Sequence, residues 1–303
     1  MDQVSFHGKD CYNEARGVKP MEFTITLPPD SPAKTVKELL EEDWLVPRKV
    51  RHFIRTRKGI LVNGKSCHFQ EQVQGNDVIT LLIEDSDYPT RTIPLGDKRL
   101  VTILYEDEHL IIVNKPAGMK THPNQPDESD TLLNHLAAYL APESQPHVVH
   151  RLDKETSGAI LFAKNQFVLP ILGRMLEKKA IYRRYQAIVH GHIAKDLTIN
   201  QKIGRDRHDR RKRRVDPKNG KAAITHVTVA HSIKKNTAIY CRLDTGRTHQ
   251  IRVHLASLGH PLVGDPLYSK DKNGRLMLHA YELHLIQPFT KKKIAVTALP
   301  GLW

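Results

Sequence analysis

The sequence predicts an α+β protein in which a mixed, mainly antiparallel β-sheet domain, with flanking helices and a central cleft, follows a small α/β domain. Three observations support this prediction. Strand-like segments outnumber helical ones and do not alternate regularly with them, as they would in a parallel βαβ sheet. The 303 residues suffice for one large domain and one small one. Apolar periodicity is lost over 83–99, where prolines and charges gather as in a linker.

The first elements predicted are a basic helix and a β-hairpin. Pro47 suits the first position of a helix, and Val50, Phe53 and Ile54 follow at helical spacing as a buried stripe. The other faces of this helix are basic, with Arg48, Lys49, Arg51, Arg55, Arg57 and Lys58. Gly59 can end the helix, and strands are predicted over 60–62 and 78–82, with the hairpin signal Asn63-Gly64 after the first.

This region resembles an S4-like RNA-binding domain. The matching segments are Val-Pro-Arg at 46–48, Leu-Val-Asn-Gly-Lys at 61–65 and Gly-Asn-Asp-Val-Ile at 75–79. The segment 36–40 departs from the usual S4 pattern, so the first helix is degenerate. We therefore expect an S4-like domain over 1–84, a linker over 85–99 and the larger domain over 100–303. On the basic helix, Arg51 and Arg55 are candidate RNA contacts; a merely solvated basic face is the alternative.

The larger domain is predicted to consist mostly of strands. They are expected over 100–104, 109–113, 159–163, 182–189, 224–230, 238–243, 282–286 and 294–298. Helices are expected over 166–178, despite Pro170 and Gly173, and from Thr248 to a left-handed cap at Gly259. The alternation in 182–189 places Tyr185, Ala187 and Val189 on one face. A basic run at 205–214 joins two strand-like segments, either as a solvated loop or as one that grips phosphates.

Composition narrows the class of partner. The chain has 47 Lys and Arg against 33 Asp and Glu, a net charge of +14, which favours a polyanion such as nucleic acid. The 3 cysteines stand apart, which argues against a disulfide framework and fits the cytoplasm. No run of 18 apolar residues predicts a membrane span, and the histidine pairs lack neighbouring ligands at metal-site spacing. We expect no membrane association and no metal.

The segment His-Arg-Leu-Asp-Lys-Glu-Thr-Ser-Gly at 150–158 carries the strongest sign of chemistry. It holds Asp153 in a polar turn between two apolar runs, and charged side chains at rigid strand ends are common functional groups. Arg151 and Lys154 beside it favour the charged carboxylate, which suits a nucleophile or a base. A solvated aspartate in a charged turn is the ordinary alternative.

Five ordered segments, 150–158 among them, resemble the RluA-type family of RNA pseudouridine synthases. The other four are Asn-Lys-Pro-Ala-Gly at 114–118, Arg-Tyr-Gln-Ala-Ile-Val-His-Gly at 184–191, Gly-Arg-Thr-His-Gln-Ile-Arg-Val-His-Leu-Ala at 246–256 and His-Pro-Leu-Val-Gly-Asp-Pro-Leu-Tyr at 260–268. The resemblance covers about residues 100–303. It implies an isomerase that converts uridine to pseudouridine in structured RNA without any cofactor.

The resemblance also implies roles for individual residues. The catalytic aspartate of the family falls on Asp153, its base-stacking tyrosine on Tyr185 and its active-site arginine on Arg252. Substrate contacts are expected from a larger set, namely Arg151, Leu152, Arg247, Leu278, Lys115, Arg51 and Arg55. Among these, Leu278 matches a position that lines the uracil pocket, and Lys115 and Arg247 are expected to contact phosphates. The expected partner is RNA, bound by a monomer.

Several alternatives remain open at this stage. Ribosomal RNA is the expected substrate, most of all that of the large subunit, and transfer RNA is the alternative. A nucleosidase or glycosidase would need a second carboxylate, for which Glu155 and Asp244 are the candidates. An RNA-binding ribosome-assembly factor without essential catalysis is the third class. The carboxylate could act at C1', at the C2' proton or at C6 of the base.

Overall fold

The computed structural model describes residues 21–84, 88, 92–271 and 274–301. It divides the chain into two compact units. One contains the residues up to Thr92 together with Pro170–Lys178 and Ile286–Ile294, and the other contains the rest. The expected linker over 85–99 lies partly outside the described residues. Cys11 lies outside them entirely.

The smaller unit is built on a four-stranded sheet with the strand order β1-β6-β3-β4. Its elements are β1 (Met21–Thr26), β2 (Lys34–Thr35), α2 (Val36–Glu38), the π-helix η1 (Leu39–Asp43), α3 (Arg48–Thr56), β3 (Ile60–Val62), β4 (Lys65–Ser66), β5 (Gln72–Val73) and β6 (Val78–Ile83). The basic helix and the hairpin are confirmed. Asn63 and Gly64 have φ of 50° and 78°, the left-handed backbone that a tight hairpin turn requires.

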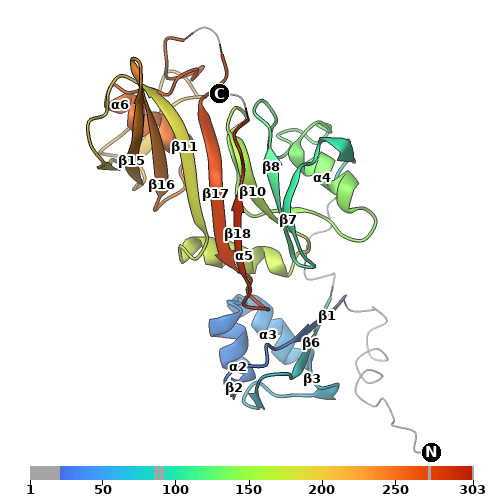
Figure 1. Cartoon of the computed structure of the whole chain (residues 1–303). Helices are drawn as coiled ribbons and strands as arrows, with labels where there is room; N and C mark the ends of the chain where they lie inside the picture. The colour runs from blue at the N-terminus through green and yellow to red at the C-terminus, as the bar shows by residue number, and fades with distance from the viewer. Residues whose placement is uncertain (1–20, 85–87, 89–91, 272–273, 302–303) are drawn as a thin grey trace, which may run out of the picture. The chain divides into compact units, whose positions relative to one another are not determined.

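The larger unit contains a mixed sheet of 10 strands with the main order β12-β15-β16-β11-β17-β10-β8-β7 (Figure 1). Its strands are β7 (Ile103–Glu106), β8 (Leu110–Lys115), β9 (His147–Val148), β10 (Ser157–Ala163), β11 (Tyr182–His190), β12 (Leu197–Asn200), β15 (Ile224–Ile233), β16 (Asn236–Leu243), β17 (Leu278–Ile286) and β18 (Lys293–Thr297). β10 and β17 pair in parallel, whereas β8, β11, β15 and β16 form antiparallel pairs. The predicted mixed, mainly antiparallel architecture is therefore confirmed.

After residue 92, the described helices are few, as expected. They are the short 3-10 helix η3 (Lys98–Leu100), α4 (Leu132–Leu140), α5 (Val168–Glu177) and α6 (Gln250–Ser257); a separate hairpin is formed by β13 (Ile203–Arg205) and β14 (Arg213–Val215). Pro170 is tolerated in α5 because it lies in the first turn, where N–H groups have no partner within the helix. Within the described ranges, no helix combines the length and apolar character needed to cross a bilayer.

One local prediction needs correction, and one helix was missed. The strand expected over 100–104 begins only at Ile103, because Asp97 caps a 3-10 turn through the N–H of Arg99 and draws Leu100 into it. Helix α4 was not predicted. Its residues Leu132, Leu136 and Leu140 are buried.

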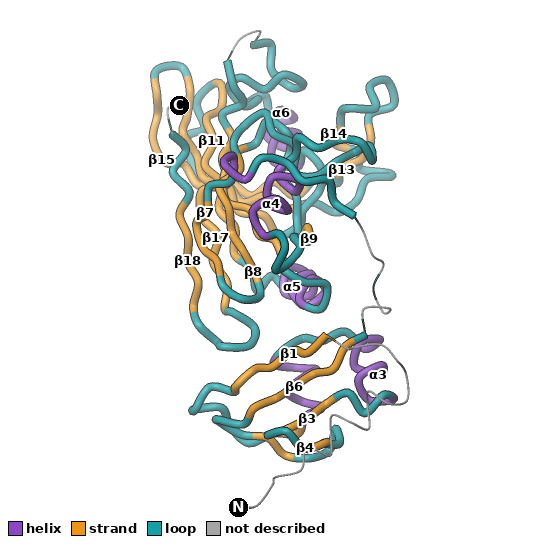
Figure 2. The backbone as a smooth tube through the Cα atoms, turned by 90° about the vertical axis from the view of Figure 1, so that its right-hand side faces the viewer, coloured by secondary structure: helices purple, strands orange, loops and turns teal. Residues whose placement is uncertain are grey.

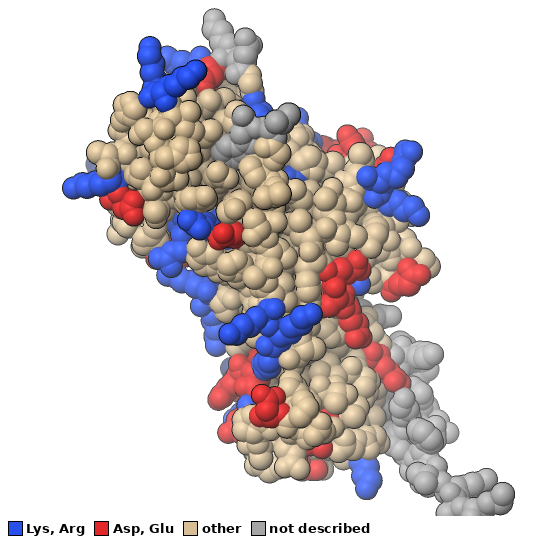
Figure 3. Space-filling model, viewed as in Figure 1, with Lys and Arg blue, Asp and Glu red and all other residues tan. Residues whose placement is uncertain are grey.

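One face of the large sheet carries the core. Leu136 of α4 and Leu255 of α6 belong to the same buried cluster as Val113, Phe162 and Tyr185 of the strands. Figure 2 shows α4 and α6 on one side of the sheet. On the face turned to the viewer in Figure 3, uncharged atoms predominate over the strands. The buried face of β11 therefore points toward the helices, and Tyr185 points with it.

Candidate active site

Asp153 lies in the turn between β9 and β10, and its side chain is 23% exposed. The hydroxyl of Thr121 donates to the carbonyl oxygen of Leu152 at 2.9 Å, and the N–H of Thr156 donates to that of Asp153 at 3.1 Å. These bonds fix the backbone on both sides of the carboxylate. The turn is therefore a built support rather than a freely solvated loop.

Lys115 holds the backbone of the same turn through its buried side chain. It is therefore not the phosphate contact that was predicted. Its side chain is fully buried, and Nζ donates to the carbonyl oxygens of Pro116 at 2.9 Å, Met119 at 2.7 Å and Lys154 at 3.0 Å. Burial lowers the pKa of Lys115 to about 7. A group so enclosed cannot reach RNA, but it ties the end of β8 to the residue that follows Asp153.

Arg252 connects Asp153 to a second, buried carboxylate. Its guanidinium donates to both oxygens of Asp265 at 2.8 Å, and its Nη1 donates to Oδ2 of Asp153 at 3.1 Å. Burial acts to lower the pKa of Arg252, but the carboxylates of Asp265 and Asp153 outweigh it, so the pKa lies above its usual value. The bidentate pair fixes the plane of the guanidinium and thereby aims the remaining N–H group at Asp153.

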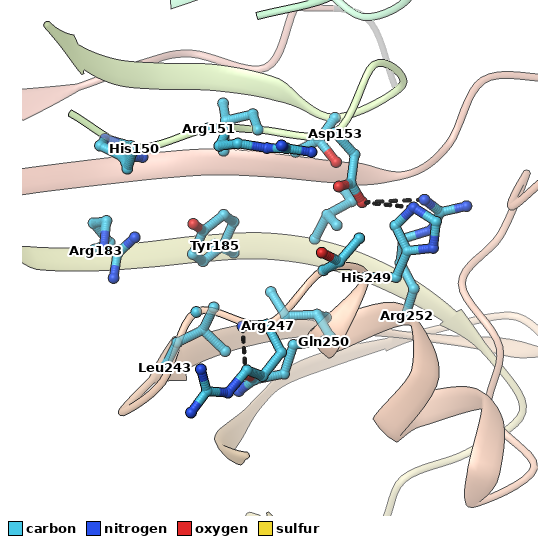
Figure 4. A pocket seen from close by; sticks show the side chains of 16 residues that line it. His150, Arg151, Asp153, Arg183, Tyr185, Leu243, Arg247, His249, Gln250 and Arg252 are labelled. Atoms are coloured by element: carbon cyan, nitrogen blue, oxygen red, sulfur yellow. Dashed lines mark hydrogen bonds and ion pairs between the residues drawn. The ribbon is translucent and has the colours of Figure 1, made fainter. Parts of the chain in front are cut away.

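His249 is a neighbour of the carboxylate that the sequence did not reveal. Its Nε2 lies 3.8 Å from Oδ2 of Asp153 (Figure 4). Its Nδ1 lies 2.9 Å from the hydroxyl of Tyr268. The contacts of the carboxylate thus come from Arg252 and His249, whereas the side chain of Arg151, expected to play that part, is exposed. His249 lies in one of the matched segments, but nothing in the segment itself indicates a partner.

A cavity of about 330 Å³ opens beside Asp153. Its lining includes Tyr185, Leu152, Leu278, Leu243, Arg151, Arg183, Arg247, His150, His249 and Arg252. Figure 4 shows His249 and Arg252 facing Asp153 at one end, Arg183 and His150 at the other, and Tyr185 between them. The volume suits a small, flat ligand with few polar anchors.

The ring of Tyr185 forms part of the cavity wall. The residue is only 6% exposed, and burial raises its pKa, so its hydroxyl is protonated at neutral pH. The predicted inward face of β11 is confirmed, since Ala187 and Val189 are buried alongside it. Leu278 and Leu152, both buried, add apolar surface to the same wall. The wall offers a planar ligand an aromatic face and aliphatic edges.

Cations surround the mouth of the site. Arg151 and Arg247 are exposed and line the cavity, where Nε of Arg247 donates to the carbonyl oxygen of Ala222 at 3.0 Å. A second cavity of about 660 Å³ shares Asp153 and Arg151 with the first. Its further basic residues are Lys120, Lys154 and Arg211. Sequence reasoning missed Arg183 and Lys120 because neither stands out from the many other basic residues.

The two arginines predicted on α3 differ in their surroundings. Arg55 is exposed, whereas Arg51 is partly buried and its Nη2 donates to Oε1 of Glu41 at 2.9 Å. Both line a basic concavity of about 1060 Å³ that also includes Phe69 and His68. The charge of Arg51 is already compensated by Glu41, so Arg55 is the freer of the two for a phosphate.

The acidic groups and histidines of the site do not form a metal centre. Among the residues that the structure describes, no group of three or more His, Cys, Asp or Glu side chains is arranged to hold a metal ion.

Comparison with known proteins connects this geometry to a chemistry. Residues 109–257 match the model of the RNA pseudouridylate synthase family, and residues 23–79 match the RluD ribosomal pseudouridine synthase N-terminal domain. The Bacillus subtilis protein YhcT, named an uncharacterized RNA pseudouridine synthase, is 39% identical over 265 residues, which span 85% of this chain and 83% of that protein. This chain belongs to the RNA pseudouridine synthase family.

Further relatives and a solved structure agree. Ribosomal large subunit pseudouridine synthase D of Neisseria meningitidis is 36% identical over 79% of this chain and 68% of that protein, and the Escherichia coli protein of the same name is 36% identical over 79% and 69%. The structure of human RNA pseudouridylate synthase domain containing 1 has a TM-score of 0.57 and 28% identity, and covers 68% of this chain and 86% of its own. The chain is therefore an RNA pseudouridine synthase, an isomerase of the RluA type.

The isomerisation that this family catalyses places clear demands on a site. The bond between N1 of uracil and C1' of ribose breaks, the detached base turns, and C5 bonds to C1' while its proton leaves and N1 gains one. No atom or electron is gained overall. A site for this reaction needs a carboxylate near the sugar, a flat surface that retains the loose base and walls that exclude water.

The glycosidase alternative finds less support in the geometry. Asp244 is held by Lys179 at 3.4 Å and by His226 at 3.3 Å, and it lines neither cavity at Asp153. Glu155 lines the second cavity, away from the wall formed by Tyr185. Neither of these two carboxylates is therefore poised beside Asp153 for glycoside hydrolysis.

Proposed function

We propose that Asp153 is the catalytic carboxylate of this pseudouridine synthase. One observation carries the proposal: Asp153 lies at the edge of a cavity walled by Tyr185, and it is aimed by an arginine whose own position is fixed by Asp265. A carboxylate in this position can stabilise the positive character that develops on the sugar as its bond to the base breaks. It can equally add to C1' or to C6, or take the C2' proton.

In this proposal Tyr185 retains the uracil by stacking. Base stacking on an aromatic ring contributes roughly 1 to 3 kcal/mol. Because burial raises the pKa of Tyr185, its hydroxyl stays protonated at neutral pH, which favours the stacking role over removal of the C5 proton. Leu278 and Leu152 would enclose the edges of the uracil ring, and Arg252 orients the carboxylate of Asp153.

The surrounding cations would bind the RNA backbone. A uridine inside a folded RNA must leave its stack to enter the cavity, at a cost of a few kcal/mol. Phosphate contacts from Arg151, Arg247 and Arg183 at the cavity, and from Arg211 on the basic hairpin, offset part of that cost. The exposed face of α3, with Arg55, would add contacts from an S4-like domain over 1–84.

We further propose ribosomal RNA of the large subunit as the substrate, since relatives at 36% identity carry that activity in their names. Such a substrate places the protein in the cytoplasm. Mapping pseudouridine across all RNA in cells with and without the gene tests the proposed substrate. Loss of sites confined to transfer RNA would reject the ribosomal substrate.

The catalytic assignment is tested with Asp153→Asn, with Glu155→Gln as a matched control in the same turn. Pseudouridine formation is followed by the release of tritium from RNA labelled at C5 of uridine, and RNA affinity is measured separately. Asp153→Asn should lose turnover by at least about 1000-fold, because nucleophilic and general-base roles both need the carboxylate. Binding should stay within a few-fold of the parent, and Glu155→Gln should remain active. Substantial turnover by Asp153→Asn would reject the assignment.

A further inference from the structure

Both partners of Asp153 approach the same oxygen of its carboxylate. Nη1 of Arg252 lies 3.1 Å from Oδ2, and Nε2 of His249 lies 3.8 Å from that atom. Among the described contacts of the side chain, none engages Oδ1. One oxygen is therefore held by the protein while the other is left to face the cavity.

The position of His249 is itself fixed by a chain of hydrogen bonds. The backbone N–H of Arg213 donates to the hydroxyl oxygen of Tyr268 at 2.8 Å, and that hydroxyl lies 2.9 Å from Nδ1 of His249. Since the oxygen already accepts from Arg213, the arrangement that uses both groups of the hydroxyl has its hydrogen donated to Nδ1. A neutral imidazole that accepts at Nδ1 carries its proton on Nε2, the atom that faces Asp153.

Other features of the ring support this arrangement. Burial lowers the pKa of His249, against the opposing effect of Asp153, which favours the neutral form at pH 7. His249 also adopts a left-handed backbone with φ of 58°, just before α6, a conformation that non-glycine residues seldom adopt. Its ring meets that of Tyr268 edge to face with centroids 5.7 Å apart. A left-handed backbone and a ring held at Nδ1 by the hydroxyl of Tyr268 indicate a side chain that is fixed in position.

We propose that His249 is a positioning residue, which together with Arg252 anchors Oδ2 of Asp153 so that Oδ1 is presented to the target uridine. Tyr268 sets the tautomer of His249, and Arg213 sets the hydroxyl of Tyr268. The separation of 3.8 Å is too long for a hydrogen bond in the free protein, and contacts of this kind shorten when substrate closes the site. Because Arg213 belongs to the basic hairpin of β13 and β14, RNA bound there would help to hold the carboxylate in place.

This inference rests on the proposed role of Asp153 and goes one step beyond it. If His249 positions the carboxylate, its loss should slow the chemical step and leave RNA binding alone. A merely structural histidine would instead lower thermal stability or raise KM. The ratio of the effects on kcat and KM therefore separates the two roles.

The experiment measures kcat, KM and Tm for the full-length protein in three variants. His249→Asn removes the donor at Nε2 and suits the left-handed backbone, since asparagine tolerates it. Tyr268→Phe removes only the hydroxyl and keeps the ring 5.2 Å from the guanidinium of Arg252. His190→Asn is the matched control, because it also breaks a histidine–aspartate contact, of 2.7 Å to Asp271, but lies outside the cavities at Asp153.

We expect His249→Asn to lower kcat about tenfold with KM within about twofold, a change equal to about 1.4 kcal/mol. Tyr268→Phe should lower kcat in the same direction, and the double variant should be no slower than His249→Asn alone, because Tyr268 acts through His249. His190→Asn should match the parent. If His249→Asn does not fold, His249→Gln takes its place. Because glutamine retains a side-chain donor, His249→Gln should keep part of kcat, and adding Tyr268→Phe should lower kcat no further.

Two results separate this inference from the role of Asp153. Parental kcat in His249→Asn, or additive losses in the double variant, would overturn the positioning role while an inactive Asp153→Asn left the catalytic assignment standing. Parental turnover in Asp153→Asn would remove both.

Discussion

Asp153 and Asp265 bind the same guanidinium, yet replacing each by asparagine should change the stability of the protein to very different extents. Asp265 is fully buried and makes two bonds of 2.8 Å to Arg252; its Oδ1 also accepts the N–H groups of Leu267 and Tyr268. Removing one partner of a buried ion pair costs about 3 to 5 kcal/mol. The remaining contact with Asp153 compensates in part, so we expect a loss of about 3 kcal/mol for Asp265→Asn.

The same change at Asp153 should hardly alter stability. Its side chain is 23% exposed and makes one bond of 3.1 Å to Arg252. A single bond of this kind contributes about 0.5 to 1.5 kcal/mol, which relief from burying a charge offsets. We therefore expect Asp153→Asn to lie within about 1 kcal/mol of the parent.

Differential scanning calorimetry at pH 7.5 compares the two variants directly. A loss of about 3 kcal/mol should lower the Tm of the larger unit by roughly 6 to 12 °C, whereas Asp153→Asn should leave it nearly unchanged. Asp265→Asn should also lose activity, because the guanidinium of Arg252 is then no longer fixed in the plane that directs its Nη1 at Asp153. Equal shifts in Tm for the two variants would refute the division into a structural and a catalytic carboxylate.

The remaining predictions concern pH, stacking and RNA contacts. Burial lowers the pKa of His150 to about 3 and that of His279 to about 4, while unfolded histidine titrates near 6.5. Below about pH 6.5 the unfolded chain thus binds protons that the folded chain does not. The free energy of unfolding, measured in urea, should therefore fall as the pH drops from about 6.5 to 4, by at most about 1.4 kcal/mol per pH unit for each histidine. A free energy of unfolding that does not change with pH would contradict this. Tyr185→Leu should weaken binding of RNA that carries the target uridine by about 1 to 3 kcal/mol while Tyr185→Phe binds normally, and equal losses would assign the role to the hydroxyl. Arg55→Ala should reduce the slope of log affinity against log salt by about 0.9 with unchanged kcat, and an unchanged slope would exclude a phosphate contact at α3.

The sequence indicated those parts of the fold that local patterns determine. Alternation identified the inward face of β11, and the Asn63-Gly64 turn identified the first hairpin, since both depend on neighbouring residues only. Helix α4 escaped because buried residues occur all around it, Asn134 and His135 included, so no single apolar stripe marks it. The inclusion of Pro170–Lys178 and Ile286–Ile294 in the smaller unit depends on distant contacts and has no local signature.

The site divides in the same way. Asp153, Tyr185 and Arg252 stood out because ordered segments surround them, and the structure brings all three to one cavity. The pairing of Asp153 with Arg252, 99 residues further along the chain, could not be derived from spacing. For Lys115 the sequence was misleading, because its charge suggested a role at the surface. Only the three carbonyl oxygens around Nζ reveal that its side chain is buried in the protein.

The most direct test of the central claim is a crystal structure of the Asp153→Asn variant bound to an RNA that contains its target uridine. The account predicts a uridine turned out of its stack, with its base against Tyr185 and its C1' or C6 within about 3.5 Å of the residue 153 side chain. A target uridine held elsewhere, with residue 153 remote from both its base and its sugar, would contradict it.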